Sequence, residues 1–371
     1  MEIYRVSAAQ ESAAGLIPAH VRRIAEFGLH AASGDNCQPW KLRWANDQLD
    51  LSIDVERARN PFADEKLDVA TLLAHGGLLE NMEAAARADG YDMSCQIFPE
   101  TSAPLLVARV RFSRAAAPQP SPLAAFIEQR CTDRRPYARG PLRPDDRAAL
   151  LAAASSSGCG LALCEDREIM STLADALGGG DRLLCAVLPL HSFLFEHIRW
   201  NRKEIELSRD GLDARNLGLG ALRPAFRLLS SWPLTQILNK LGLQTIIAKK
   251  SSRLYSQSAA FGLITTAGRS KQDYVECGRV LQRVWLTAAS RGLAFQPLTA
   301  LLYFANYLNE DIASNIPNAL KEIRRSAQRV LESAFPSAKP AGVPVMLFRV
   351  GKTDAPRPFA SLRRPLAAHM A

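Results

Sequence analysis

The sequence predicts an α+β fold in which strands are flanked by long helices, and three observations support this prediction. Residues 41–44 and 49–53 alternate apolar and polar side chains on either side of Asn46-Asp47, which is typical of a β-hairpin. Residues 68–89 have the apolar spacing of a helix and are followed by Gly90, a common helix end. The order helix, small polar residues, strand recurs over residues 143–164, a weak echo that indicates two related halves.

The other predicted elements also alternate in type along the chain. Helices are expected at 17–32, 169–188, 193–207 and 272–291, and strands at 96–98, 105–112, 259–266, 293–295 and 343–350. Three prolines within residues 115–122 indicate a linker, which divides the chain into a first half at 1–114 and a second half at 123–371. Residues 210–253 interleave Leu, Phe and Trp with Lys and Arg, which fits a helical insert, a membrane-surface helix or a lid. We expect an insert or a lid.

Composition and charge narrow the possible functions. The 371 residues are 47% apolar and 22% charged, which is ordinary for a globular chain of one large or two smaller units. Lys and Arg (46) outnumber Asp and Glu (37) without forming a basic run, so a phosphorylated cofactor is favoured over nucleic acid. Seven cysteines without a Cys-x-x-Cys, and histidines without metal-ligand spacing, predict no metal site and fit a reducing cytoplasm. No signal region or membrane span is predicted.

Two distant stretches combine residue types that bind ligands. Residues 31–40, Ala-Ala-Ser-Gly-Asp-Asn-Cys-Gln-Pro-Trp, join a predicted helix to a predicted strand and can present N–H groups and amides to a ligand. In residues 130–137, alternation places Arg130, Thr132 and Arg134 on one face of an extended chain, where two guanidiniums and a hydroxyl can surround a phosphate. Taken separately, the first is also compatible with a turn before a core Trp, and the second with a solvated basic face or a salt-bridged turn.

Together the two stretches resemble the FMN-dependent nitroreductase superfamily, whose members typically carry an Arg-x-Ser-x-Arg element and a Pro-Ser-x-x-Asn-x-Gln-Pro-Trp-like element. Thr132 stands where the family has Ser and keeps the hydroxyl, whereas Ala32 replaces a Pro. Residues 278–293 resemble the family's penultimate helix and strand, and residues 349–364 resemble its end. The cofactor-binding residues that this resemblance implies are Ser33, Asn36, Gln38, Arg130, Thr132, Arg134, Gln296, Pro297, Leu298 and, for the phosphate, Arg363 or Arg364.

The resemblance also implies an architecture. Nitroreductase-like proteins have mixed or antiparallel sheets flanked by helices and are usually homodimers that bind FMN at the subunit interface, with the two elements of one site supplied by different subunits. This chain carries each element once, in different halves. It therefore resembles a fused pair of subunits, a pseudo-dimer with one good flavin site and one degenerate site.

The implied function is that of an FMN-dependent oxidoreductase that passes hydride or electrons between NAD(P)H, or an oxidisable small molecule, and an acceptor. The flavin carries this chemistry, so no catalytic side chain is assigned. One alternative is a flavin-sequestering, FMN-storage protein whose lid blocks NAD(P)H, and another is a basic interaction protein without a cofactor. The expected setting is cytoplasmic, with a small-molecule substrate, and the chain either a monomeric pseudo-dimer or part of a homo-oligomer.

Overall fold

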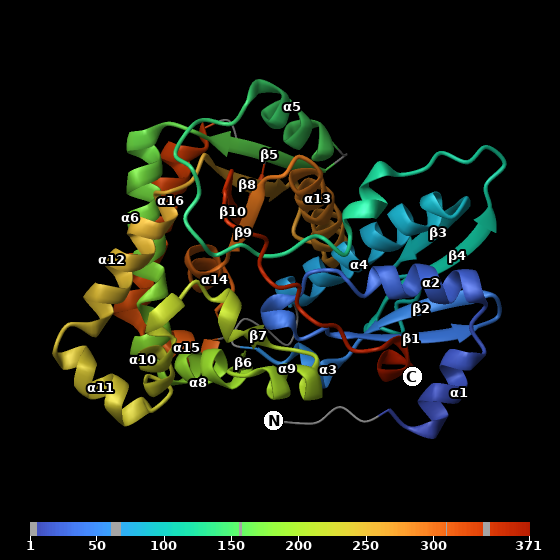
Figure 1. Cartoon of the computed structure of the whole chain (residues 1–371), viewed down its shortest axis with the longest axis horizontal. Coiled ribbons are helices and arrows are strands. Elements are labelled where there is room, and N and C mark those ends of the chain that lie inside the picture. The colour runs from blue at the N-terminus through green and yellow to red at the C-terminus, as the bar shows by residue number, and fades with distance from the viewer. Residues whose placement is uncertain (1–5, 61–67, 156–157, 309, 337–341) are drawn as a thin grey trace.

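The structure is a computed structural model that describes residues 6–60, 68–155, 158–308, 310–336 and 342–371. Two four-stranded antiparallel sheets, each flanked by helices, form the predicted α+β fold (Figure 1). The strands of one sheet come from residues 40–114 and those of the other from residues 159–351. The two sheets therefore fall on either side of the segment at 115–122.

The first sheet has the order β1-β2-β4-β3. Its strands are β1 (Trp40–Ala45), β2 (Gln48–Ile53), β3 (Tyr91–Ile97) and β4 (Leu106–Arg114). Asn46 and Asp47 between β1 and β2 have positive φ values of 52° and 55°, as a type I′ turn requires, so the predicted hairpin is confirmed. Leu42 and Leu51, which pair across the hairpin, are fully buried in the core with α2 (Ala19–Gly28) and α4 (Val69–Ala88).

The second sheet has the order β5-β8-β10-β9. Its strands are β5 (Cys159–Cys164), β8 (Ala260–Thr266), β9 (Ala294–Leu298) and β10 (Val343–Gly351). Every residue of β8 is buried, as expected for a central strand covered on both faces. Gly262 of β8 lies beneath the ring of Phe348, and a Cβ there would lie 2.1 Å from a ring carbon, so the close fit of these strands requires glycine.

Helices connect and cover the sheets. The N-terminal and connecting helices are α1 (Ala8–Gly15), α3 (Val55–Ala58), α5 (Pro144–Ala153) and, between β5 and β8, α6 (Arg167–Asp181), α7 (Leu183–Ala186), α8 (Leu188–His197), α9 (Arg202–Ser208), α10 (Arg223–Leu228), α11 (Trp232–Lys240) and α12 (Leu243–Tyr255). The later helices are α13 (Lys271–Ser290), α14 (Ala300–Asn306), α15 (Glu310–Asn315) and α16 (Pro317–Ala334). Helices α12 and α16 pack against α6 (Figure 1). A short parallel pair, β6 (Ile198–Arg199) and β7 (Leu212–Asp213), follows α8.

Helices α4 and α13 cross at the centre of the molecule and join the two halves. Their backbones approach most closely at two glycines: a Cβ on Gly76 would lie 2.0 Å from the carbonyl oxygen of Val275, and one on Gly278 would lie 2.2 Å from that of Leu73. Only glycine permits such an approach. The crossing fixes the position of the site described below, because both helices line it.

The C-terminal segment returns from the second sheet to the first (Figure 1). After β10 the chain reaches the short 3₁₀ helix Leu366–His369, Met370 forms a parallel bridge with Leu42, and the Ala371 N–H donates to the carbonyl oxygen of Leu42 at 2.9 Å. The last ten residues thus lie beside β1, and they bring Arg363 and Arg364 to the junction that precedes this strand.

Most predicted elements are present, and two helices differ from the prediction. The helix predicted at 169–188 ends at Asp181, after Gly178-Gly179-Gly180, and continues as the separate helix α7. The single helix predicted at 193–207 is instead two helices, α8, which starts at Leu188 and ends at His197, and α9 (Arg202–Ser208), with β6 between them. The stretch 210–253 contains the helices α10 and α11 and most of α12, so it is largely helical.

Candidate functional site

The junction between α2 and β1 has an irregular backbone that directs the side chains of Ser33, Asp35 and Asn36 into a cavity. A single turn of 3₁₀ helix spans Gly34–Asn36, and Asp35, Asn36 and Gln38 have positive φ values of 45°, 57° and 54°. Asn and Asp tolerate this conformation better than most residues. The Ser33 hydroxyl accepts a hydrogen bond from the Gln38 N–H at 3.0 Å, which helps to hold the turn.

The second predicted element, residues 130–134, is extended and lies against β9. The Asp133 N–H donates to the carbonyl oxygen of Phe295 at 3.0 Å, and the Asp133 carboxylate pairs with Arg135. The alternate residues Arg130, Thr132 and Arg134 all face one cavity, as the period of an extended chain predicts.

This cavity has two connected parts. The part that we call the polar chamber has a volume of 80 Å³ and is lined by the junction, by Arg130, Thr132 and Arg134, and by Arg363 from the C-terminal segment. The other part, the apolar chamber, has a volume of 200 Å³ and is walled largely by α4, α13 and side chains such as Phe193, Leu281 and Trp285. The two chambers share the lining residues Ala32, Ser33, Asp35, Thr132 and Arg134. An elongated ligand with one anionic end and one flat apolar end suits this shape.

Three guanidinium groups surround the polar chamber, and their surroundings differ. Arg363 donates to the carbonyl oxygens of Leu29, His30 and Ala31 and to Oδ1 of Asn36, so it ties the C-terminal segment to the end of α2. Arg130 stacks over Trp285, with its Cζ 4.4 Å from the ring centroid, and its Nε is buried without a hydrogen-bond partner. Arg134 forms no hydrogen bond or ion pair with any residue in the described ranges.

Burial makes the charged forms of these arginines energetically costly in the absence of an anion. It lowers the pKa of Arg130 to about 10, and burial together with the charge of Arg130 lowers the pKa of Arg363 to about 9. Burial also lowers the pKa of Arg134, although the Asp35 carboxyl acts in the opposite direction. A bound anion would offset the cost of keeping these charges out of water.

Asp35 is the acidic group closest to the shared wall of the chambers. Burial raises its pKa, while His197 and Arg134 act to lower it. Burial, followed by the charge of Asp35, raises the pKa of the neighbouring Cys37 thiol to about 12, so that this thiol stays protonated at neutral pH. The junction thus places a buried carboxyl and a neutral thiol beside the apolar chamber.

Residues 193–216 cover one side of the cavity. Phe193 reaches the apolar chamber, and Asp213 and Asn216 reach the polar chamber. This cover is tied down by Asp210, which pairs with Arg57 at 3.1 Å and with Arg199 at 2.7 Å. Within the predicted insert at 210–253, the residues that reach the cavity are among its first seven.

The structure brings together seven of the eleven residues predicted to bind the cofactor. Ser33, Asn36, Arg130, Thr132, Arg134, Pro297 and Arg363 line one or both chambers. The Gln38 side chain is fully buried instead, and it donates to the carbonyl oxygen of Arg209 at 2.9 Å and accepts from the N–H of Arg364. Gln296 accepts from Arg349, Leu298 is a core residue, and Arg364 donates to the carbonyl oxygen of Ala368.

Several lining residues had not been predicted from the sequence. Asp35, Phe193 and Trp285 line the apolar chamber, as do Thr71 and Gln282. The Asp35 position lies inside the predicted junction, so its proximity could have been inferred. The others stand on helices whose local pattern indicates only burial.

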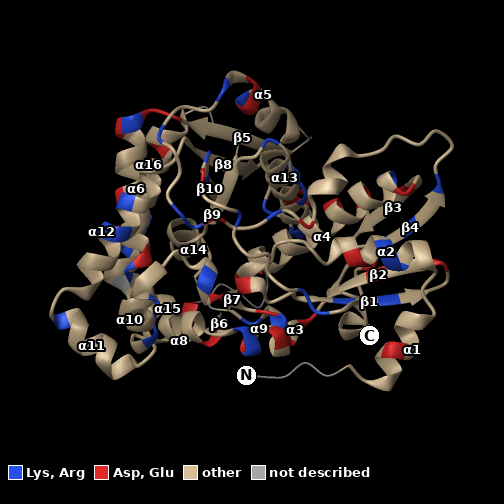
Figure 2. Cartoon of the chain, in the orientation of Figure 1, with Lys and Arg blue, Asp and Glu red and all other residues tan. Residues whose placement is uncertain are grey.

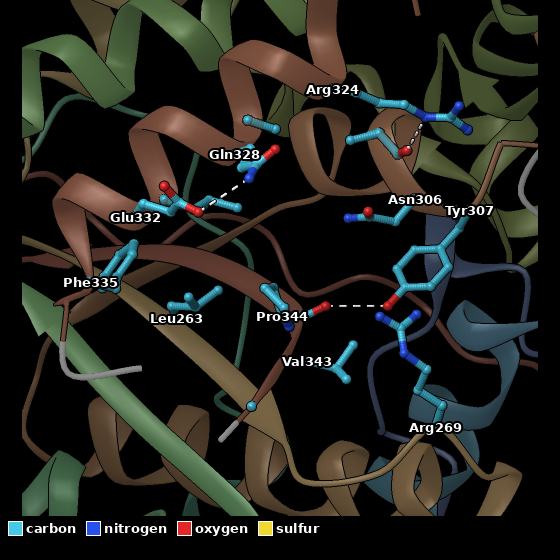
Figure 3. A pocket seen from close by; sticks show the side chains of 14 residues that line it. Leu263, Arg269, Asn306, Tyr307, Arg324, Gln328, Glu332, Phe335, Val343 and Pro344 are labelled. Carbon is cyan, nitrogen blue, oxygen red and sulfur yellow. Dashed lines mark hydrogen bonds between the residues drawn. The ribbon is translucent and has the colours of Figure 1, made fainter. Parts of the chain in front are cut away.

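A larger cavity of 540 Å³ lies between α16 and the strands β8 and β10 (Figure 3). Its floor is apolar, with Leu263 and Phe335, and at its rim the Tyr307 hydroxyl donates to the carbonyl oxygen of Pro344 at 3.2 Å. It contains none of the predicted cofactor-binding residues. We therefore assign no ligand to it.

Comparison with known proteins gives the following similarities. No family model matches the chain. An uncharacterized protein of Mycobacterium tuberculosis (strain CDC 1551 / Oshkosh) is 25% identical over 347 residues, which cover 92% of this chain and 46% of the relative. The chain thus spans about half the length of this curated relative.

Among solved structures, similar chains include two nitroreductases. The FMN-dependent nitroreductase of Mycobacterium smegmatis in complex with NADPH is 14% identical and has a TM-score of 0.34 over 62% of this chain and 88% of its own. The nitroreductase of Bacteroides fragilis with bound FMN is 11% identical and has a TM-score of 0.33 over 65% and 95%. A BluB-like flavoprotein of Clostridium difficile 630 is 12% identical and has a TM-score of 0.35 over 64% and 92%.

Within the described ranges, every helix is too short or too polar to cross a bilayer. In the same ranges, His, Cys, Asp and Glu side chains do not gather in threes or more as a metal site would require.

Proposed function

We propose that this chain binds FMN in the two-part cavity and acts as an FMN-dependent oxidoreductase of nitroreductase type. The observation that carries the proposal is the convergence of Arg130, Thr132 and Arg134 with the junction around a small polar chamber that opens into an apolar one. FMN, when bound, would supply hydride and electron transfer between NAD(P)H, or another reduced small molecule, and an acceptor.

The residues present fit the chemical groups of FMN. Arg134 and the Nε of Arg130 offer unused donors, and the Thr132 hydroxyl lies between them in sequence, which is a donor set suited to a phosphate. The polar chamber has room for about two to three water molecules, comparable to one phosphate group. The ring of Trp285 and the aliphatic wall of Leu281 suit a flat aromatic ring system.

The chain's own residues would then position the cofactor and exclude water from it. The stacking of Arg130 on Trp285 links the anion-binding end to the apolar wall, so that both ends of the site have a fixed separation. Asp35, whose pKa is raised by burial, and the neutral thiol of Cys37 would border the ring with polar groups that tune its reduction potential. Phe193 would shield the ring from solvent on the covered side.

We also propose that the chain is a fused pseudo-dimer, with halves at 1–114 and 123–371, and that it has one functional site. The cavity uses the first part of α4 together with one face of α13, formed by Gly278, Leu281, Gln282 and Trp285. The last part of α4 instead faces Arg279 and Arg283 of α13 and is occupied by ion pairs. There, Glu80 accepts from Arg279 and from Arg283, and Glu83 pairs with Arg279. Arg279 and Arg283 are therefore already neutralised and do not offer a second phosphate site.

A second candidate function is flavin sequestration, and the cover over the cavity favours it. The cover is tied to the junction by the Gln38 amide, which donates to the carbonyl oxygen of Arg209, and to α3 by the ion pair of Asp210 with Arg57. A cover that stayed closed would keep NAD(P)H from stacking on the flavin at the distance of about 3–3.5 Å that hydride transfer needs.

One experiment tests binding and separates the two functions. The purified chain is reconstituted with FMN, its absorption spectrum is recorded, and NADH or NADPH is added anaerobically. We expect a bound flavin that bleaches on addition of one of these nucleotides. A flavin that binds but does not bleach, although dithionite reduces it, would favour sequestration, and failure of the chain to retain FMN would refute both functions.

A further inference from the structure

The surface formed by α10, α11 and α12 has an unusual charge distribution. Residues 217–255 contain six Lys and Arg side chains and no Asp or Glu, which leaves 40 cationic and 37 anionic side chains in the rest of the chain. This segment therefore carries six of the nine net positive charges. Figure 2 shows basic but no acidic positions on α10 and α11. We call the exposed face of these three helices the basic helical surface.

The basic side chains of this surface are unpaired. All six are exposed, and within the described ranges none of them forms an ion pair. They are Arg223, Arg227, Lys240, Lys249, Lys250 and Arg253. Elsewhere the chain uses arginine differently, as in the pairs of Arg279 and Arg283 with Glu80. Since the cations of the basic helical surface are not neutralised within the fold, they are available to an external anion.

Large apolar side chains are exposed among these cations. Of the eleven such side chains in the described residues, five belong to this surface: Leu222 (55% exposed), Leu228 (64%), Ile237 (59%), Leu241 (75%) and Ile246 (63%). Ile237 of α11 and Leu241, the residue that caps its C-terminal end, are four residues apart. Lys240 lies beside them in sequence, so apolar and basic groups are interleaved.

The opposite faces of these helices are anchored to the rest of the protein, so the exposed groups are held by ordered structure. The Tyr255 hydroxyl of α12 donates to Asp181 of α6 at 2.6 Å, and the backbones approach so closely that a Cβ on Gly178 would lie 2.4 Å from the carbonyl oxygen of Ala248. The Asn239 amide of α11 donates to the carbonyl oxygen of Cys185 at 2.8 Å. The exposed leucines and isoleucines are therefore not turned outward by loose packing.

We propose that the basic helical surface docks on an anionic membrane surface without crossing the bilayer. Helices that lie at the membrane interface combine Leu, Ile or Trp with Lys and Arg, and they gain affinity both from apolar burial and from attraction to anionic lipid. Each Lys or Arg close to such a leaflet contributes about a fivefold increase in affinity. A wholly apolar interface between two copies of the chain would not explain six like charges, which would repel across a twofold axis.

The proposal is tested by sedimentation of the full chain with lipid vesicles. One set is pure phosphatidylcholine, and the other contains roughly one third phosphatidylglycerol. We expect the protein to pellet with the anionic vesicles and to remain in the supernatant with the neutral ones. Binding should fall at least about tenfold when NaCl is raised from about 0.05 M to about 0.5 M, because salt screens the attraction.

Matched variants locate the surface. Lys249→Glu with Lys250→Glu, and separately Leu241→Glu, should each lower binding about tenfold or more. The controls are Lys321→Glu with Lys352→Glu, and Leu16→Glu, which is also 75% exposed but lies on α1. Equal binding to both vesicle types, or equal losses in the controls, would overturn the proposal. The proposal would also be overturned if the chain did not pellet with either vesicle type and was instead a dimer that Leu241→Glu converts to a monomer. The surface would then join two copies of the chain.

Discussion

Arg134 and Arg130 occupy the same cavity but depend on it to different extents. Arg130 already stacks on Trp285 and donates to the carbonyl oxygen of His30 at 3.0 Å, whereas Arg134 has no hydrogen-bond partner among the described residues. Replacing Arg134 therefore removes little from the folded chain without ligand. Its donors are the ones that a phosphate would use most completely.

We expect Arg134→Ala to weaken FMN binding by about ten- to a hundredfold, because a lost charge-assisted hydrogen bond costs about 1.5–3 kcal/mol. The melting temperature of the apoprotein should change little. Quenching of FMN fluorescence measures the first quantity and thermal unfolding the second. Arg139→Ala, which removes an exposed arginine from the same loop, is the control. Equal affinities of the two variants would contradict the phosphate role of Arg134.

His369 illustrates how a buried imidazole sets acid sensitivity. It is 1% exposed, its Nδ1 lies 3.2 Å from the carbonyl oxygen of Trp40, and its Nε2 has no hydrogen-bond partner. Since a carbonyl can only accept, Nδ1 carries the proton and the ring is neutral. Burial, followed by the charge of Arg364, lowers the pKa of His369 to about 3.

The sign of the resulting pH dependence follows from linkage. The unfolded chain binds a proton at this histidine below about pH 6.5, but the folded chain does so only near pH 3, so stability is lost as the pH falls through this window. His369→Gln keeps a donor for the Trp40 carbonyl and cannot titrate. We expect its free energy of unfolding to fall less steeply between pH 6.5 and pH 4, by up to about 1.4 kcal/mol per pH unit. Parallel curves for the two proteins would exclude His369 as the source.

At the scale of elements, the crossing of α4 and α13 couples stability to the cavity. A methyl group on Gly76 would meet the Val275 carbonyl oxygen at 2.0 Å and the Gly278 Cα at 2.8 Å, so Gly76→Ala must push the helices apart. We expect a loss of about 3 kcal/mol or more in the free energy of unfolding, measured by denaturant titration. Gly179→Ala, in the last turn of α6 with open space around it, should cost nothing and serves as the control.

Gly77→Ala separates cavity shape from stability. Its methyl group would make ordinary contacts of 3.6 Å with Ala31 and Gln282, but Gly77 also lines the apolar chamber. We expect unchanged or slightly raised stability together with weaker FMN binding. Unaltered binding would show that the ring system does not approach this part of α4.

Elements with a strong local signal could be predicted, and elements that depend on tertiary contacts could not. The β1–β2 hairpin followed from Asn46-Asp47 because that turn type needs residues that tolerate positive φ. The start of helix α8 was misplaced because Leu188, which is 46% exposed, has no polar cap before it. This helix depends on packing against α10 and α11, where the His191 ring lies 2.7 Å from the carbonyl oxygen of Leu229. Helix α16 was missed, although Leu320, Ile323 and Ala327 follow helical spacing and are buried.

The candidate site divides in the same way. Arg130, Thr132 and Arg134 could be placed on one face because a period of two is a local property of an extended chain. The local sequence does not predict whether a side-chain amide faces a ligand or another part of the chain. Gln38 bonds to a residue 171 positions away, and Gln296 bonds to one 53 positions away. The same holds for Trp285, whose ring meets Arg130 across 155 positions of the chain.

At the scale of the whole molecule, the two ends of α4 have different surroundings where it crosses α13. The first end borders the cavity, and the other holds the ion pairs of Glu80 and Glu83 with Arg279 and Arg283. The C-terminal segment adds to this asymmetry. It brings Arg363 to the cavity, where the Arg363 guanidinium binds the carbonyl oxygens at the end of α2.

This asymmetry predicts one FMN per chain. The protein is saturated with FMN, freed of excess ligand by gel filtration and denatured, and the released flavin is measured against the protein concentration. We expect a molar ratio near one, because among the described residues one end of the crossing combines arginines without ion pairs with an apolar chamber, while the other is occupied by ion pairs. Arg134→Ala should lower this ratio toward zero. Arg279→Ala, which breaks the ion pairs at the other end, should leave it near one, whereas a ratio near two in the unmodified chain would mean that those ion pairs open to admit a second flavin.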